Sequence, residues 1–302
     1  MKKSMAAAFA ALSFAVSAHA QSTAFEWMCR TADPASSAVS SLVLLQSSDM
    51  SFAAFHSPAV IPDSPDRFAV KAGYSLEGSP LAGGPVNAGA AVRIGRRVGI
   101  ALAGSFNPGG TYDVIDDSGS RDGTFRTSSM LFSAGVGVKV IGGLSLGVNL
   151  KYAGENLAPD SRPGAFASDV YALFRWKWLG VTAGVSNVGT PVKDLGGASF
   201  SLPSAARLAV GYSSCFGEKH FVGAGVGADC FFTGKLAASA GASYSFNDML
   251  SVRAGYRFSS ASALPSCGTL GLGVKFFGVR IDAAYLLSSG PDVLALSLGY
   301  SF

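Results

Sequence analysis

The sequence predicts an all-β protein, a transmembrane antiparallel β-barrel of about 14 strands with a short plug-like segment before it. Segments of about ten residues after position 66 alternate between apolar and small or polar side chains, the period of two of a β-strand. The chain is 49% hydrophobic and 14% charged, yet no stretch after the N-terminus supplies the roughly 18 consecutive apolar residues of a membrane-spanning helix. A soluble β-sandwich would also alternate, but repeated apolar faces opposite glycine and basic residues favour a closed sheet in lipid.

The first twenty residues are predicted to be a secretory signal peptide. Lys2 and Lys3 supply its charged part, residues 5–16 its apolar part, and Ala18-His19-Ala20 a small-x-small cleavage site. The mature chain then begins at about Gln21. Export and the barrel pattern together predict a multi-pass protein of the bacterial outer membrane.

Charge and cysteine content exclude several classes of protein. Without Lys2 and Lys3, 21 basic residues stand against 19 acidic ones, a balance with no nucleic-acid footprint. The spacing of the four cysteines matches no zinc or redox motif, so we expect no metal and no cofactor. Disulfides are permitted in an exported chain, but their pairing cannot be read from the sequence. The four are Cys29, Cys215, Cys230 and Cys267.

Residues 21–66 differ from the rest and are predicted to be a periplasmic or lumenal segment. They lack strand alternation and carry five acidic residues against the single Arg30. A cap at Ser47-Ser48-Asp49 predicts a short helix over Met50–Phe55, which Pro58, Pro62 and Pro65 would end. The acidic residues are Glu26, Asp33, Asp49, Asp63 and Asp66.

Residues 67–302 are predicted to be the barrel itself. Tight turns near 95–97, 142–143, 247–248 and 277–278 follow even-numbered strands, and long connections at 107–123, 154–165, 188–204 and 259–267 follow odd-numbered ones. If both ends are periplasmic, the tight turns face the periplasm and the long loops face outward. The expected strands are 67–76, 86–94, 98–106, 126–140, 144–152, 166–178, 181–187, 206–212, 220–230, 236–246, 250–258, 270–276, 279–287 and 293–302.

The last strand has one apolar and one small or polar face. Leu298, Tyr300 and Phe302 continue the apolar face, and Ser297 and Gly299 lie on the other. The segment resembles the terminal strand of bacterial outer-membrane barrels, in which a final Phe is the recognition mark for barrel assembly. The resemblance implies contacts with outer-membrane lipid and with the barrel assembly machinery.

Basic residues dominate the face opposite the apolar one, where the acids are chiefly Asp169, Asp229 and Asp282. One interpretation is an anion-selective pore. The other, which we favour, is that the acidic segment 21–66 folds into the lumen and pairs with these bases, while Gly73, Gly135 and Gly137 leave room for it. The basic residues are Lys71, Arg93, Lys139, Lys151, Arg175, Lys177, Arg207, Arg253, Arg257, Lys275 and Arg280.

The sequence gives no sign of an enzyme. The mature chain has two histidines, His56 and His220, and neither has a visible nucleophile or orienting partner. No phosphate-binding glycine loop or nucleophile elbow is present, because the glycines alternate within strands and no helix follows them.

The stretch 48–59 resembles the N-terminal motif of the PorV/PorQ family of outer-membrane proteins. Asp49, Phe55 and His56 precede Pro58 and Ala59, whereas a serine stands where that family has the Asn of its Asn-Pro-Ala. The chain's length looks more like PorQ, which implies a non-enzymatic component of the type IX secretion and cell-surface attachment machinery, with secretion or surface proteins as partners. Barrel size and plan are also similar to FadL-like transporters, which implies the alternative of a transporter or channel for small hydrophobic or anionic solutes.

Overall fold

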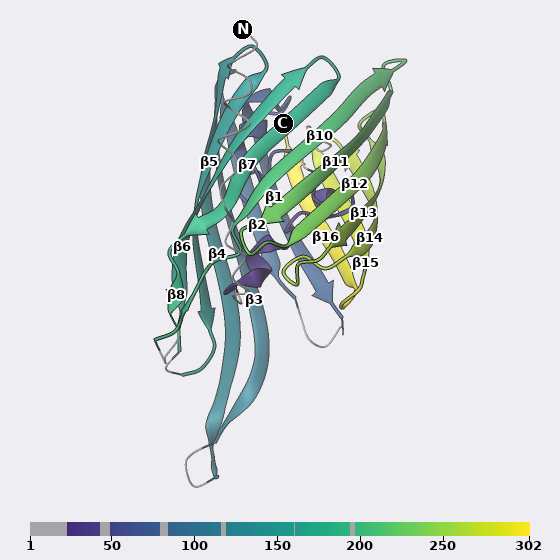
Figure 1. The fold of residues 1–302 in the computed structure, drawn as a ribbon. Helices are drawn as coiled ribbons and strands as arrows, with labels where there is room; N and C mark the ends of the chain where they lie inside the picture. Colours follow the sequence, from purple (N-terminus) through teal and green to yellow (C-terminus); the bar gives the residue numbers. More distant parts are fainter. Residues whose placement is uncertain (1–22, 43–48, 79–83, 116–118, 160, 194–196) are drawn as a thin grey trace.

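A computed structural model describes residues 23–42, 49–78, 84–115, 119–159, 161–193 and 197–302, and within them fourteen antiparallel strands form a closed barrel (Figure 1). The signal peptide predicted at 1–20 lies outside these residues. The barrel strands are β1 (Phe68–Glu77), β2 (Val86–Ile94), β3 (Val98–Ile115), β4 (Arg121–Ile141), β5 (Leu144–Asn156), β6 (Gly164–Trp176), β7 (Leu179–Gly189), β10 (Ala205–Phe216), β11 (His220–Phe231), β12 (Leu236–Phe246), β13 (Leu250–Ser259), β14 (Cys267–Phe276), β15 (Val279–Ser288) and β16 (Val293–Ser301).

The barrel closes where its last strand meets its first. β16 pairs with β1 in a continuous register from Ala69↔Ser301 to Glu77↔Val293. Beyond the strand, the carbonyl of Phe302 accepts hydrogen bonds from the backbone N–H groups of Arg67 and Phe68, at 2.6 and 3.0 Å. No edge of the sheet is left to pair with another chain, so the expected closure is confirmed.

The outer surface of the barrel is apolar. In β16, Leu294, Leu296 and Leu298 are exposed, while Ala295 and Ser297 between them are buried. Large exposed hydrophobic residues recur in this way on the other barrel strands. An apolar surface around a closed barrel suits lipid, and the chain is a multi-pass barrel of the bacterial outer membrane. None of the helices in the described ranges has the length and apolar character needed to span a membrane.

Tight turns join β2 to β3, β4 to β5, β12 to β13 and β14 to β15, as the sequence predicts. The long connection expected at 107–123 is wrong, because β3 and β4 continue as a paired hairpin that projects beyond the other strands (Figure 1). Outside the membrane this ribbon needs no apolar face, so its polar composition reads as a loop. The loop expected at 188–204 also contains two short paired strands, β8 (Val192–Lys193) and β9 (Ser199–Phe200).

The described residues before the barrel form three short helices: η1 (Glu26–Cys29), α2 (Pro34–Ser37) and η3 (Pro58–Asp63). The helix expected over Met50–Phe55 is wrong, because this stretch is a series of turns. The Asp49 carboxylate does accept a hydrogen bond from the Ser51 N–H at 3.0 Å, but that bond caps a turn. Pro58 begins η3 rather than preventing a helix, since proline is favoured at the first helical positions.

Residues 23–42 and 49–66, named the plug below, fill the barrel interior. Met50, Ala54 and Ile61 of the plug form a buried core with Ala69 and Ala101 of the wall. Glycines make this approach possible: a Cβ on Gly137 would lie 1.9 Å from the Pro58 carbonyl oxygen, and one on Gly135 would lie 2.6 Å from the Pro58 ring. A Cβ on Gly73 would come no closer than 3.8 Å to the plug, at Ala32, so this glycine is not needed for the fit.

Candidate functional site

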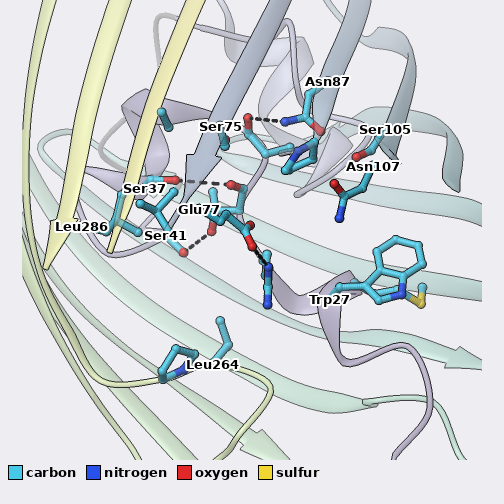
Figure 2. A pocket seen from close by; sticks show the side chains of 18 of the residues that line it. Trp27, Ser37, Ser41, Ser75, Glu77, Asn87, Ser105, Asn107, Leu264 and Leu286 are labelled. Carbon is cyan, nitrogen blue, oxygen red and sulfur yellow. Dashed lines mark hydrogen bonds and ion pairs between the residues drawn. The ribbon is translucent and has the colours of Figure 1, made fainter. Parts of the chain in front are cut away.

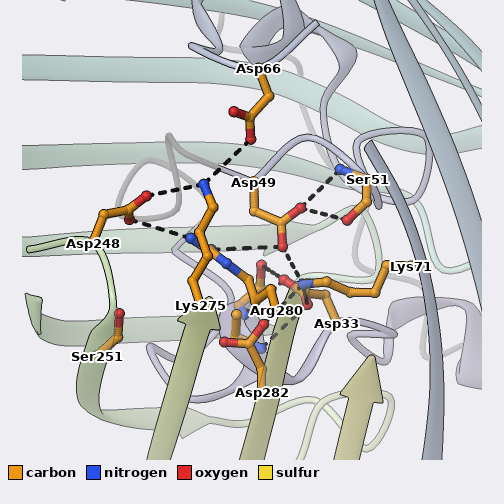
Figure 3. A network of polar contacts seen from close by, with 12 residues as sticks. Asp33, Asp49, Ser51, Asp66, Lys71, Asp248, Ser251, Lys275, Arg280 and Asp282 are labelled. Atoms are coloured by element: carbon orange, nitrogen blue, oxygen red, sulfur yellow. Dashed lines mark hydrogen bonds and ion pairs between the residues drawn. The ribbon is translucent and has the colours of Figure 1, made fainter. Parts of the chain in front are cut away.

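A buried lysine of the wall holds the plug through three carboxylates. Lys71 Nζ lies 3.3 Å from Asp33 and 3.1 Å from Asp282, and it also forms an ion pair with Asp49 (Figure 3). Asp33 and Asp49 belong to the plug, and Asp282 belongs to β15. Lys71 and the three acids are all less than 9% exposed by side chain, so water screens these interactions little.

Neighbouring bases extend this cluster along the wall. Arg253 pairs with Asp282 at 2.9 Å, and Arg280 lies 4.0 Å from Asp49. Lys275 lies 3.7 Å from Asp66 of the plug. Burial alone would raise the pKa values of Asp33 and Asp49, but the charge of Lys71, joined at Asp49 by Arg280, outweighs burial and lowers both. Both carboxyl groups are therefore ionised at neutral pH.

Five more of the predicted lumen bases also have partners. Asp63 of the plug lies 2.6 Å from Lys139 and 3.7 Å from Arg175. Wall carboxylates serve the others: Lys151 pairs with Asp169 at 2.6 Å, and Arg207 with Asp229 at 3.5 Å. Arg93 donates to the backbone carbonyls of Pro65, Asp66 and Gly95.

This pairing changes the interpretation of the lumen. An anion-selective pore requires a ring of basic residues without acidic partners. The basic residues at these positions instead form ion pairs with carboxylates. Lys177, expected on the sixth strand, lies instead at the turn after β6, with its ammonium over the Trp176 ring.

The residues of the family-like motif lie in the plug. His56 is 9% exposed, and its Nε2 has no hydrogen-bond partner among the described residues. Burial, reinforced by Arg207 and Lys151 and opposed by Asp33, lowers the pKa of His56 to about 4. Ala59 is fully buried, and Pro58 precedes it at the start of η3.

Other parts of the motif serve packing. Phe55 contacts Phe52, with ring centroids 5.6 Å apart. Ser57, which stands in place of the family's Asn, makes no side-chain cap, and its hydroxyl has no partner within the described chain. The motif residues therefore shape the plug.

The structure offers neither a Ser-His pair nor a metal centre in the ranges it describes. His220 Nδ1 lies 2.8 Å from the Tyr244 hydroxyl, and both side chains are exposed. No group of three or more His, Cys, Asp or Glu residues could hold a metal ion in the described part of the chain. The four cysteines are free, and burial raises the pKa of the Cys29 thiol to about 11.

A cavity of about 150 Å³, named the outer cavity below, lies between the plug and the wall at the long-loop end of the barrel. Trp27, Met28 and Arg30 line it from the plug, and Leu264 lines it from the connection between β13 and β14. Ser75, Asn87, Ser105 and Asn107 form a polar wall on β1, β2 and β3 (Figure 2).

The charges around the outer cavity are few. Arg30 forms an ion pair with Glu77 of β1. The indole N–H of Trp27 donates to Glu155, which fixes the ring. Arg257 of β13 donates to the Pro265 carbonyl at 3.2 Å and to the Ser41 hydroxyl at 3.5 Å.

Sequence reasoning missed this cavity. Its lining comes from many separate segments, from Trp27 to Ala295, and no local pattern joins them. Of the charged residues that line the cavity, only Arg257 was among the eleven basic residues predicted to face the lumen. Its position before an expected outer loop was the available signal.

Comparisons with known proteins connect this architecture to one group of structures. No family model and no curated protein matches the chain. The toluene transporter TodX of P. putida is similar in structure, with a TM-score of 0.57 at 12% identity over 81% of this chain and 92% of that chain. A Pseudomonas aeruginosa FadL homologue gives 0.55 at 13% identity over 90% and 99%. The monoaromatic hydrocarbon channel CymD gives 0.59 at 13% identity over 90% and 98%.

In fold, the chain is similar to outer-membrane channels of the FadL type. At this level of identity the likeness concerns the fold alone. The solved structures give no specific support for the PorV/PorQ resemblance.

Proposed function

We propose that the chain is a non-enzymatic outer-membrane transporter for small, largely hydrophobic solutes. The fold resembles that of a toluene transporter and that of a monoaromatic hydrocarbon channel. The chain itself adds an apolar exterior that fixes it in lipid and a lumen filled by the plug. A filled lumen argues for passage of selected molecules rather than for general diffusion.

The observation that carries the proposal is the outer cavity. Its volume of about 150 Å³ equals that of an engineered protein cavity that binds benzene, so it fits one ring. It lies at the end of the barrel with the long connections, which faces the outside in barrels of this plan. Trp27, Phe55 and Leu264 give it apolar surface, as small-molecule sites require.

Uptake into vesicles tests the proposal. The mature chain, reconstituted in liposomes, is expected to speed the entry of radiolabelled monoaromatic compounds over protein-free vesicles. Ser105→Phe, which fills the cavity, should remove most of this increase. Phe106→Leu, one residue away on the exposed outer face, should leave it unchanged. Entry no faster than in protein-free vesicles would refute the transporter function.

A second candidate function rests on the projecting hairpin. Residues 107–115 of β3 and 121–127 of β4 extend past the other strands, and Tyr112 and Ile115 are exposed there. An exposed two-stranded ribbon with aromatic and aliphatic side chains suits contact with a secretion or surface protein. In this second candidate function, the chain is a component of the type IX secretion and cell-surface attachment machinery.

Crosslinking in intact cells separates the two candidates. A photoreactive residue at Tyr112 should capture a surface or secretion protein if the hairpin is a docking arm. Loss of solute uptake on deletion of the chain, without a secretion defect, would favour transport instead.

A further inference from the structure

The outer cavity contains a buried cation without a buried anion beside it. Arg257 is 7% exposed, and its hydrogen-bond partners are the Pro265 carbonyl, the Ser41 hydroxyl and the Cys267 thiol, all of them neutral groups. Within the described residues no carboxylate lies within 4.0 Å of its guanidinium, whereas Lys71, Lys151 and Arg253 each have one. A guanidinium withdrawn from water is costly unless an anion compensates it.

The charges around the cavity do not cancel. Its lining includes Arg30, Arg257 and Glu77, and the described lining has no other charged residue. Arg30 neutralises Glu77 through their ion pair, which leaves one positive charge, on Arg257. An excess of one charge suits a monoanion better than a dianion such as phosphate.

The rest of the lining suits one ring. The Trp27 indole is held by Glu155, and Leu264 provides aliphatic surface across the cavity. The volume of about 150 Å³ admits a single six-membered ring with a small substituent, and no long acyl chain.

We propose that the outer cavity binds a one-ring monocarboxylate, with the carboxylate on Arg257 and the ring between Trp27 and Leu264. This inference rests on the proposed transporter function and narrows its solutes to those that carry an acidic group. A planar guanidinium binds a carboxylate through two parallel hydrogen bonds, which toluene cannot accept.

Calorimetric titration of the purified mature chain in detergent at pH 7 tests the proposal. The ligands are benzoate, benzyl alcohol and toluene, which share one ring and differ in their polar group. Benzoate is expected to bind about tenfold or more tightly than the other two. Arg257→Gln should weaken benzoate by roughly 10- to 100-fold, the range of a hydrogen bond to a charged group, and change benzyl alcohol little.

Two further variants separate charge from structure. Glu77→Gln raises the positive charge of the lining and should tighten benzoate binding, the opposite sign to Arg257→Gln. Arg121→Gln removes an exposed arginine of the hairpin and should have no effect. The shift in gel mobility on heating, a property of folded barrels, shows that each variant has folded. If Arg257→Gln does not fold, Arg257→Lys replaces it in the titration.

Equal benzoate affinity in the wild type and a folded Arg257→Gln would overturn the inference, and so would tighter binding of toluene than of benzoate. Binding of acetate as strong as that of benzoate would also overturn it, since the ring would then contribute nothing. The outcomes differ from those of the uptake experiment. Vesicle uptake of toluene with no preference for benzoate removes this inference alone, and benzoate binding without uptake of any solute removes the transporter function alone.

Discussion

The imidazole of His56 makes the plug sensitive to pH. Because burial lowers its pKa from 6.5 to about 4, the unfolded chain takes up a proton before the folded one as the pH falls. The stability that this difference contributes is full above pH 6.5 and is lost between about pH 6.5 and 4, by about 3 kcal/mol at most. Asp33 and Asp49, whose pKa values are lowered, lose their contributions only at lower pH.

The measurement is the urea midpoint of the refolded protein in detergent at pH 7, 6 and 5. We expect the midpoint to fall with pH in the wild type and to fall less in His56→Gln. The same decline in both proteins would mean that another group titrates.

Replacement of Lys71 is expected to weaken the attachment of the plug to the barrel wall. Lys71→Met leaves Asp33, Asp49 and Asp282 facing one another without the ammonium group. Removal of one partner from a buried ion pair costs about 3 to 5 kcal/mol. We expect the plug to become sensitive to protease while the barrel stays intact.

Limited proteolysis followed by mass spectrometry gives the cleavage positions. Lys71→Arg keeps the charge and should retain most of the protection. Lys177→Met, at a turn of the barrel, is the matched control and should behave like the wild type. Plug peptides that stay uncut in Lys71→Met would contradict this role.

At the scale of elements, the sequence predicted what alternation and charge control. A strand with one face toward lipid carries apolar residues at every second position. The spacing of Leu294, Leu296 and Leu298 therefore predicted that these side chains lie on the outer, lipid-facing side. The acidic segment before the barrel likewise indicated partners for the lumen bases, because buried charges need counter-charges. The hairpin of β3 and β4 was not predicted, because a two-stranded ribbon that extends into water does not need a continuous apolar face.

The candidate site was less predictable for a related physical reason. The outer cavity forms where Trp27, Glu77, Arg257 and Leu264 meet, and barrel closure alone brings these distant segments together. Arg257 was visible as a lumen base, but its lack of a carboxylate partner depends on where every described acid lies. Such a feature exists only in three dimensions.

The hairpin should be separable from the barrel. Beyond Phe106, β3 pairs only with β4, and register irregularities interrupt the ladder between Pro108 and Thr111 and again between Asp113 and Ile115. Replacement of residues 109–126 by a two-residue turn is therefore expected to leave barrel folding unchanged. The shift in gel mobility on heating should match the wild type, whereas photocrosslinking from the hairpin would lose its site. A chain that no longer folds would show that the hairpin supports the barrel.

On the scale of the whole molecule, two surfaces of opposite character share one sheet. The outside is apolar and meets lipid, and the inside is polar and meets the plug through ion pairs to Lys71, Lys139 and Lys275. Fourteen strands enclose an interior that side chains of the wall alone do not fill, and the plug packs into that interior, so we expect conduction through the barrel to depend on the plug.

Deletion of residues 21–66 should therefore turn a closed barrel into an open one. In planar bilayers we expect the full mature chain to show little conductance and the deletion variant to show large, steady steps. Without plug carboxylates, Lys71, Lys139 and Arg175 lose acidic partners, so the open pore should prefer anions. Reversal potentials in a salt gradient give that preference. Lys71→Met, which weakens one attachment, should show brief openings between these extremes. Equal, large conductance with and without residues 21–66 would mean that the segment does not close the lumen.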